Sequence, residues 1–223
     1  MIHIFRIVFV MGLMLIVHFR ADGQAFRNFR DNPAFHEEIN FTNVDYERIN
    51  ELIFLLTNEI RESKRLKSLE YSKELGKAAT MHARDMVDKK FFAHLNPYDP
   101  VRKTPSDRAK LCNISNPYVA ENLIEGYGLR YVANHPVYFL APGVFSSSPR
   151  GAPIKPHTYM SFCEAQLKGW MNSPGHKANI LDKEAFQIGC GTAGFTDQKF
   201  NNMPSFYVVQ NFQRFEPAKV IKQ

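Results

Sequence analysis

Three residues in this chain combine chemically useful side chains with positions at the edges of predicted elements: His94, Glu121 and His176. Each lies just outside an apolar segment, where packed structure holds a side chain that still reaches solvent. Two imidazoles and a carboxylate could bind a divalent cation such as zinc, with His94 and His176 as ligands. The same groups could perform metal-free acid–base catalysis, with the carboxylate orienting one imidazole. Because the three residues are far apart in the sequence, spacing alone favours neither chemistry.

The segment before His176 explains how that histidine is placed. Residues 160–171 carry apolar side chains at steps of three and four, which predicts an amphipathic helix. Ser173-Pro174-Gly175 then ends that helix, because proline lacks an amide donor and glycine tolerates positive φ. We expect the break to place His176 on a turn. A capping or loop histidine with no chemical role is the competing interpretation.

Two further helices are predicted upstream. Asn43 is positioned to cap a helix whose apolar side chains recur from Tyr46 to Ile60. A second helix is predicted from about residue 71 to residue 90, and His82 lies on its apolar face. A histidine there is better interpreted as a hydrogen-bonded core residue than as a ligand.

The C-terminal part of the chain changes from helical to strand patterning. Residues 186–195 and 205–215 predict two strands joined by a turn. Apolar residues occupy both faces of the second strand, which indicates a sheet covered on both sides. Helices followed by a hairpin indicate an α+β fold. The intervening residues 127–159 are rich in proline, glycine and serine and predict a long ordered or semi-ordered loop of the kind that often covers a functional site.

Length and charge limit the function classes. The 223 residues suffice for one sizeable globular domain. The net charge of +6 is not accompanied by a stripe of basic residues interleaved with aromatic ones, so nucleic-acid binding is not expected.

Residues 1–23 predict a signal peptide, because the apolar run 7–17 is too short to span a membrane. A short membrane anchor is the alternative. We expect a secreted or periplasmic protein with no stable membrane span after cleavage, comprising an extension at 24–42, a domain at 43–215 and a tail at 216–223.

Three cysteines leave two possibilities open. Cys112, Cys163 and Cys190 could form one disulfide by any of three pairings in an oxidising compartment. Free buried thiols that pack as small hydrophobic groups are equally compatible with the sequence.

Taken in order, short motifs between about residues 49 and 212 resemble the CAP superfamily (cysteine-rich secretory proteins, antigen 5 and plant pathogenesis-related proteins, also called SCP-like), and its bacterial branch in particular. The motifs are Asn58-Glu59-Ile60-Arg61, Ala79-x-x-His82-Ala83-x-x-Met86, Phe92-Ala93-His94, Ala120-Glu121-Asn122-Leu123, Trp170-Met171-x-Ser173-Pro174-Gly175-His176-x-x-Asn179-Ile180-Leu181, Ile188-Gly189-x-Gly191 and Tyr207-Val208-Val209-Gln210-x-Phe212.

The resemblance implies a three-layer α–β–α sandwich with a central antiparallel sheet and a cleft lined by two histidines and two acidic residues. His94, Glu121 and His176 match three of these four. The second acid falls near Ser173, where bacterial members also tend to carry serine, and Glu164 is too far back along its helix to replace it. The loop 127–159 is longer than the corresponding segment of the family, so we expect it to be specific to this protein.

The resemblance supports a site but no particular reaction. The leading hypothesis is a secreted binding protein whose His/Glu cleft and long loop engage an extracellular lipid, peptide or protein. The alternative is a metal-dependent or metal-free hydrolase of peptides, esters or glycans that uses the same three residues. A third interpretation makes the polar group a purely structural network.

Overall fold

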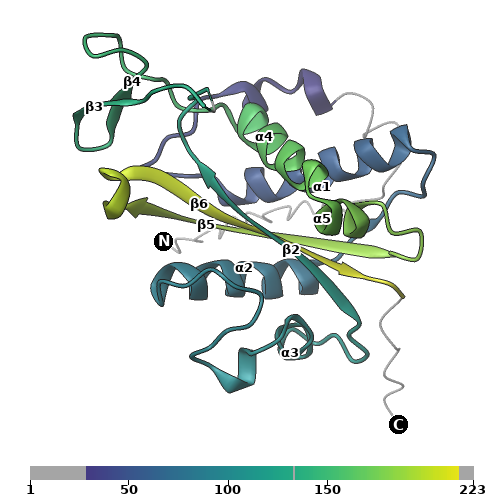
Figure 1. Cartoon of the computed structure of the whole chain (residues 1–223). Coiled ribbons are helices and arrows are strands. Elements are labelled where there is room, and N and C mark those ends of the chain that lie inside the picture. The colour runs from purple at the N-terminus through teal and green to yellow at the C-terminus, as the bar shows by residue number, and fades with distance from the viewer. Residues whose placement is uncertain (1–28, 133, 216–223) are drawn as a thin grey trace, which may run out of the picture.

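A computed structural model describes residues 29–132 and 134–215, in which helices cover both faces of a central sheet (Figure 1). The predicted signal peptide at 1–23, the first residues of the predicted extension and the predicted tail at 216–223 lie outside the described residues. The helices are α1 (Tyr46–Ser63), α2 (Lys73–Asp88), α3 (Pro105–Leu111), α4 (Tyr159–Asn172) and α5 (Pro174–Ile180). The strands are β1 (Glu70–Tyr71), β2 (Val119–Tyr127), β3 (Tyr138–Ala141), β4 (Val144–Ser146), β5 (Gln187–Asp197) and β6 (Met203–Gln213).

The main sheet has the strand order β1-β5-β6-β2. Strands β5 and β6 form the predicted antiparallel hairpin, and β2 pairs antiparallel with the other side of β6. Only the two-residue strand β1 runs parallel to its neighbour β5. The predicted α+β sandwich with a largely antiparallel sheet is confirmed, and β2 forms one edge of the sheet.

Side-chain alternation along the strands divides the core into two layers. Ile188, Val208 and Phe212 face α1 and α4 and join the largest hydrophobic cluster, which also contains the fully buried Trp170. The opposite face of the sheet packs against α2. This contact depends on two glycines of β5, which have no side chain. A Cβ atom added at Gly189 or Gly191 would lie 2.1 Å from a backbone nitrogen of α2. These glycines therefore let the helix lie directly on β5.

Several element boundaries differ from those expected. Asp45, rather than Asn43, caps α1 by accepting a hydrogen bond from the Arg48 amide. Helix α2 begins two residues later than expected, because Tyr71 pairs with β5 and Ser72 provides the cap. The turn expected at His176 is wrong. Pro174 starts a new short helix, since its fixed φ suits the first helical position, and His176 lies within α5.

The segments expected to be irregular contain more structure than their composition indicates. Strand β2 was not expected, because its polar residues interrupt the apolar alternation. The predicted loop 127–159 contains the separate β3–β4 hairpin. In the N-terminal segment, Phe29, Phe35 and Ile39 are buried in the same hydrophobic cluster as α1 and α4.

All three cysteines are free and buried, which decides between the two possibilities left by the sequence. Burial raises the pKa of the Cys163 and Cys190 thiols, because a thiolate is poorly stabilised in an apolar core. They act as small hydrophobic side chains. In the part of the chain that the structure describes, no helix has the length and hydrophobicity required to cross a membrane.

Candidate functional site

The candidate site is organised around Glu121 and Asn122, two consecutive residues of the edge strand β2. Because side chains alternate along a strand, these two project to opposite faces of the sheet. Glu121 faces the layer that contains α2 and α3, and Asn122 faces the layer that contains α4 and α5. Each side chain contacts one of the segments that carry a candidate histidine.

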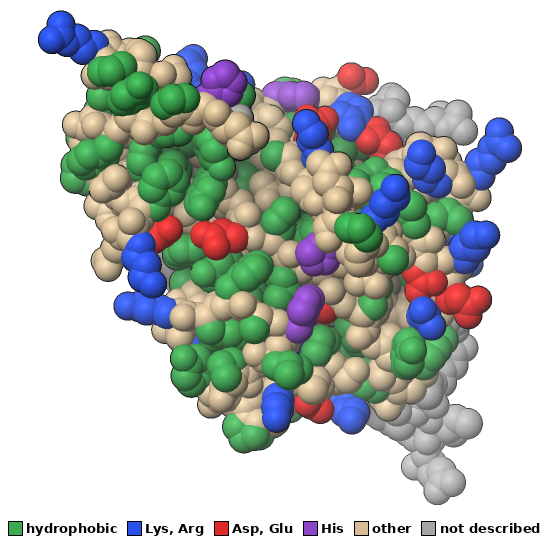
Figure 2. Space-filling view, viewed as in Figure 1, with side chains coloured by type: hydrophobic (Ala, Val, Ile, Leu, Met, Phe, Trp, Pro, Cys, Tyr) green, Lys and Arg blue, Asp and Glu red, His purple; other side chains and the backbone are tan. Residues whose placement is uncertain are grey.

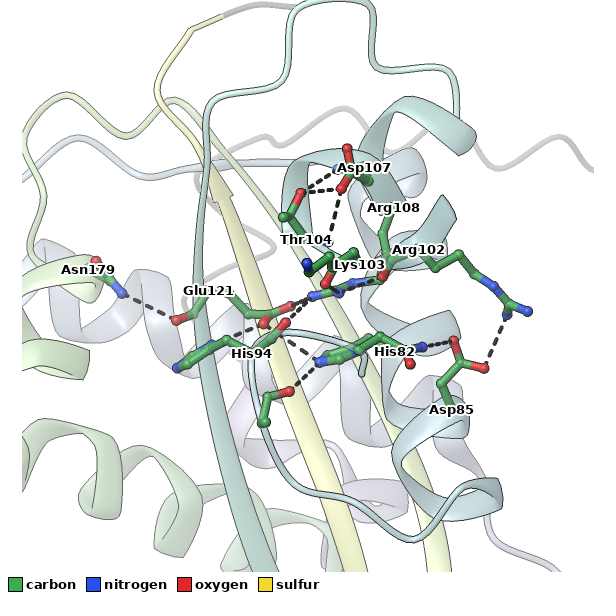
Figure 3. Close-up of polar contacts among 12 residues, drawn as sticks. His82, Asp85, His94, Arg102, Lys103, Thr104, Asp107, Arg108, Glu121 and Asn179 are labelled. Atoms are coloured by element: carbon green, nitrogen blue, oxygen red, sulfur yellow. Dashed lines mark hydrogen bonds and ion pairs between the residues drawn. The ribbon is translucent and has the colours of Figure 1, made fainter. Parts of the chain in front are cut away.

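Glu121 makes direct contact with His94. The Nδ1 atom of His94 lies 3.0 Å from Oε1 of Glu121 (Figure 3). The Glu121 side chain is 1% exposed, whereas the His94 side chain is 52% exposed. A buried carboxylate therefore holds one edge of an imidazole whose remaining surface is accessible to solvent.

Arg108 of helix α3 neutralises the buried carboxylate from the other side. Its Nη2 atom donates to Oε2 of Glu121 at 2.7 Å and to the backbone oxygen of His94 at 3.1 Å. The Arg108 side chain is completely buried, as is usual for a charge only when it is paired. A capping box formed by Thr104 and Asp107 fixes the start of α3. One guanidinium thus positions both the carboxylate and the backbone of His94.

His82 of α2 is buried behind the same carboxylate. Its Nε2 atom lies 2.9 Å from the backbone oxygen of Ala93 and 3.8 Å from Oε1 of Glu121. Burial lowers the pKa of His82, because the imidazolium would lose its hydration. The expectation of a hydrogen-bonded core histidine fits this environment. Its ring nevertheless contributes to the surroundings of Glu121 and supports the residue that precedes His94.

The loop that carries His94 is also attached to α2 through Asp85. This carboxylate accepts a hydrogen bond from Arg102 at 3.1 Å (Figure 3). It also accepts one from Asn96 at 3.0 Å, and the Lys89 side-chain nitrogen lies 3.4 Å away. Asp85 is buried, so these contacts compensate for its lost hydration. They fix the loop that follows His94.

His176 is positioned from the opposite face of β2. The Asn122 side-chain nitrogen donates to the backbone oxygen of His176 at 3.1 Å and to Oε1 of Gln210 at 3.1 Å. Asn179 donates to Oδ1 of Asn122 at 2.9 Å. Gln210 in turn donates to the Thr57 hydroxyl at 2.7 Å. A chain of neutral hydrogen bonds therefore connects α5 through β2 and β6 to α1.

Arg61 of α1 holds the C-terminal end of α5. Its Nη1 atom donates at 2.8 Å to the backbone oxygens of both Ile180 and Asp182. A cation at this end also interacts favourably with the helix dipole. The helix that carries His176 is therefore attached at its middle by Asn122 and at its end by Arg61.

The two histidines are close enough to influence each other electrostatically. Partial burial, and then the neighbouring His94, lower the pKa of His176. Figure 2 shows histidine side chains at the surface near the middle of one face, among hydrophobic side chains. Within the described residues, the His176 ring makes no hydrogen bond or ion pair with His94 or Glu121. The structure thus brings His94 and Glu121 into contact and places His176 nearby.

A cleft at these residues stays a prediction. One pocket of about 170 Å³ is lined by Leu56, Leu167 and other residues of α1 and α4. Another of about 270 Å³ is lined by Tyr46, Arg84 and Gly194, among others. Neither pocket includes His94, Glu121 or His176.

Comparison with known proteins decides the family. The model of the "CAP: Cysteine-rich secretory protein family" matches residues 54–137 and 143–212, which is more than half of the chain. The chain belongs to this family. The predicted membership in the CAP superfamily is confirmed.

Bacterial proteins are among the relatives of this CAP domain. The uncharacterised protein YkwD of Bacillus subtilis is 29% identical over 136 residues, which cover 61% of this chain and 39% of that protein. An extracellular protein containing an SCP domain, from Bacillus anthracis, has 24% identity and a TM-score of 0.51, over 76% of this chain and 41% of that one. An outer surface protein of Borrelia burgdorferi has 18% identity and a TM-score of 0.49, over 81% of this chain and 99% of that one. This chain thus spans about two fifths of the two Bacillus proteins.

The donor set of this CAP domain does not fit a three-ligand zinc site. Catalytic zinc usually takes three protein ligands and a water. Both carboxylate oxygens of Glu121 are already engaged, one by Arg108 and the other by His94. In the described part of the chain, no group of three or more His, Cys, Asp or Glu side chains is arranged to hold a metal ion. Metal binding by His94 and His176 alone stays a prediction.

Ser173 occupies the position at which the resemblance implies a second acid. Ser173 is the residue between α4 and α5, and its side chain makes no capping hydrogen bond. Glu164 is paired with Arg30 at 2.7 Å, on the surface that faces α1 and the N-terminal segment. It therefore does not take the place of the second acid.

The sequence alone did not indicate that Arg108 pairs with Glu121 or that Asn122 holds helix α5. Arg108 lies in a basic stretch that resembles an ordinary solvated surface, and apolar periodicity gives no signal for a buried charge. Asn122 and Asn179 were visible only as members of family motifs. The signal that could have found Arg108 is the buried carboxylate itself, because such a group requires a cationic partner.

Proposed function

We propose that this CAP-domain protein is exported and binds an extracellular ligand through the surface formed by His94, Glu121 and His176. The observation that carries the proposal is the contact between the exposed His94 ring and the buried, Arg108-paired Glu121. A purely structural network would not require the ring to be half exposed. The apolar run at 7–17 and the extracellular Bacillus anthracis protein support export.

The surroundings of His94 favour a ligand with both apolar and hydrogen-bonding groups. Phe92 is 45% exposed and Leu95 is 51% exposed, so large apolar side chains flank the histidine on its loop. The Phe92 ring packs against Tyr207 of β6 at a centroid distance of 5.1 Å, which fixes its position. Exposed apolar groups beside a few fixed polar groups are typical of peptide and small-ligand sites. An extracellular peptide or protein segment fits this surface best, with a lipid as the further possibility.

A phage-displayed peptide library selected on the purified protein tests the proposal. We expect enriched peptides to bind the unaltered protein and to lose at least tenfold in affinity to the His94→Ala/His176→Ala variant, since most binding energy comes from a few central residues. The matched control is His36→Ala/His135→Ala, which removes two exposed histidines from other surfaces. Equal affinity for all three proteins would contradict the proposal.

Hydrolysis is the second candidate, and one specific contact favours it. When the Nδ1–H of His94 donates to Glu121, the Nε2 atom is left as a proton acceptor. Among the described residues, no serine, threonine or cysteine side chain is hydrogen-bonded to His94, so the base would act on water rather than on a side-chain nucleophile.

Hydrolysis of ester, peptide and glycan panels tests this second candidate. Turnover by the unaltered protein is expected to fall by about 10²–10⁴-fold in His94→Ala, the usual contribution of a general base. Activity that persists in this variant would contradict a role for His94 in catalysis. A zinc titration by calorimetry on the same two proteins tests the metal prediction separately.

A further inference from the structure

Strand β3 exposes three consecutive large apolar side chains. Tyr138 is 38% exposed, Phe139 is 49% exposed and Leu140 is 41% exposed. The β3–β4 hairpin does not join the main sheet and projects from one corner of the molecule (Figure 1). Its apolar residues lie on both sides of a two-stranded ribbon, and such a ribbon cannot bury both faces by itself.

Only one side of this hairpin is covered by the rest of the protein. Phe139 is paired with Phe145 across the ribbon, and their ring centroids are 6.3 Å apart. Phe145 is buried in a small cluster with Leu129 and Met203, which attaches the hairpin to the domain. The pairing is irregular between Phe139 and Ala141, where a bulge twists the edge strand. The hairpin is therefore attached through β4 and presents β3 outward.

The segment that contains the hairpin carries basic residues and no acidic ones. Between Glu125 and Glu164 the chain carries no acidic residue. Arg130, Arg150 and Lys155 lie in this interval and are exposed. Figure 2 shows hydrophobic side chains gathered at this corner, with basic charge projecting beyond them.

The basic side chains are largely available for an external partner. Glu38, from the N-terminal segment, lies 3.9 Å from Arg130, a long ion pair between exposed groups. Within the described residues, Arg150 and Lys155 make no ion pair. The backbone amide of Arg130 donates to the Lys155 oxygen at 2.9 Å, so these two positions are adjacent.

We propose that the β3–β4 hairpin docks on the surface of an anionic lipid bilayer. Phe139 and Leu140 enter the boundary between headgroups and acyl chains, and Tyr138 lies at the headgroup level. Arg150 and Lys155 contact the anionic headgroups. A second copy of the chain would bring basic residues against basic residues, so self-association is disfavoured. The exposed apolar residues of β3 lie outside the matched stretches of the CAP family, which leave out residues 138–142.

A tryptophan reporter on the full chain tests this proposal. The chain has one native tryptophan, the buried Trp170, so a second one in Phe139→Trp reports on the hairpin. With vesicles of phosphatidylcholine and phosphatidylglycerol, we expect a blue-shifted emission that brominated acyl chains quench. The control Tyr98→Trp places the reporter on a residue that is 62% exposed in another loop, and we expect no quenching there. Residues 1–28 are common to all variants, so a difference in quenching between the two reporters arises from the reporter positions.

Variants of the basic residues and of the apolar residues separate the electrostatic and the hydrophobic contributions to vesicle binding. Each of Arg150→Ser and Lys155→Ser is expected to weaken vesicle binding about fivefold, the usual effect of one basic residue near an anionic surface. Phe139→Ser/Leu140→Ser is expected to abolish the hairpin's contribution while leaving the melting temperature nearly unchanged, because both side chains are half exposed.

Three results would overturn the proposal. The first is equal quenching in Phe139→Trp and Tyr98→Trp. The second is equal binding to neutral phosphatidylcholine vesicles. The third is concentration-dependent dimerisation that Phe139→Ser/Leu140→Ser removes, which would identify a second copy as the occupant.

Discussion

The two sides of strand β2 hold the candidate histidines in different ways. On one side, the charged pair of Glu121 and Arg108 is buried and contacts the ring of His94. On the other side, the neutral amides of Asn122 and Asn179 hold α5, and Asn122 contacts only the backbone of His176. The orientation of the first imidazole is therefore fixed, whereas the second ring is placed by its helix alone. The difference favours His94 as the acid–base residue and His176 as an adaptable contact for a ligand.

Removing the buried cation is expected to have the largest effect on the charged side. Arg108→Met leaves Glu121 buried without its ion-pair partner, and we expect the free energy of unfolding to fall by about 3–5 kcal/mol in urea titrations. The control Arg102→Met removes a partly exposed arginine whose partner Asp85 keeps Lys89 and Asn96, and should cost about 1 kcal/mol. Equal losses in the two variants would contradict the central place of the Arg108–Glu121 pair.

Breaking the neutral hydrogen bonds of Asn122 is expected to lower the free energy of unfolding by less than the loss of Arg108, and to affect helix α5. Asn122→Ala leaves the buried side-chain oxygen of Gln210 without its donor and removes one acceptor of the partly buried Asn179, which corresponds to about 2–3 kcal/mol. We also expect faster hydrogen exchange of the α5 amides, with little change in the loop that carries His94. Unchanged exchange in α5 would contradict the role of Asn122 in holding this helix.

Acid is expected to destabilise both sides of the sheet, because each side holds a histidine whose pKa is lowered by burial. Burial, and then the charge of Arg130, lower the pKa of His157 to about 4, and burial lowers the pKa of His82. The unfolded chain binds protons at these rings below about pH 6.5, before the folded chain does. The free energy of unfolding should therefore decrease as the pH falls from about 6.5 toward 4.

The contribution of His157 to this decrease can be isolated. We expect it to be about 2 kcal/mol after allowance for its partial exposure, and His157→Gln should remove it. Denaturant titrations between pH 7 and 4 compare the two proteins. Parallel stability curves for the variant and the unaltered protein would contradict the assignment.

Replacing the two candidate histidines should have the smallest effect on stability. His94→Ala/His176→Ala is expected to change the melting temperature by less than about 4 °C, because neither ring supports packed structure. A decrease of well over 10 °C would instead favour the purely structural interpretation of the polar group. Differential scanning calorimetry distinguishes these outcomes.

The sequence predicted the parts of this fold that depend on local pattern. Apolar periodicity identified α1, α2 and α4, and strand-type composition on either side of a turn identified β5 and β6. Strand β2 was missed because Glu121, Asn122 and Glu125 interrupt its pattern, and the first two of these residues make it the centre of the candidate site. The residues that serve the site are thus the ones that obscure its secondary structure.

The contacts of the site required the three-dimensional structure. His94 and Glu121 were named together only by type and by family resemblance, and their 3.0 Å contact arises from the packing of α2, α3 and β2. Nothing in the sequence indicated that Arg108 is buried, because an arginine among other basic residues is most often solvated. The helical placement of His176 was missed because Pro174 was interpreted as a helix breaker, although it starts α5.

The claim that Glu121 orients the His94 ring is tested most directly by the tautomer of that imidazole, measured by long-range proton–nitrogen NMR correlation near neutral pH. We expect the neutral ring to carry its proton on Nδ1, because Glu121 accepts from that atom. Glu121→Gln should reduce this preference while His176 keeps its own pattern. A ring protonated mainly on Nε2, with no response to Glu121→Gln, would contradict the claim that the buried carboxylate orients His94.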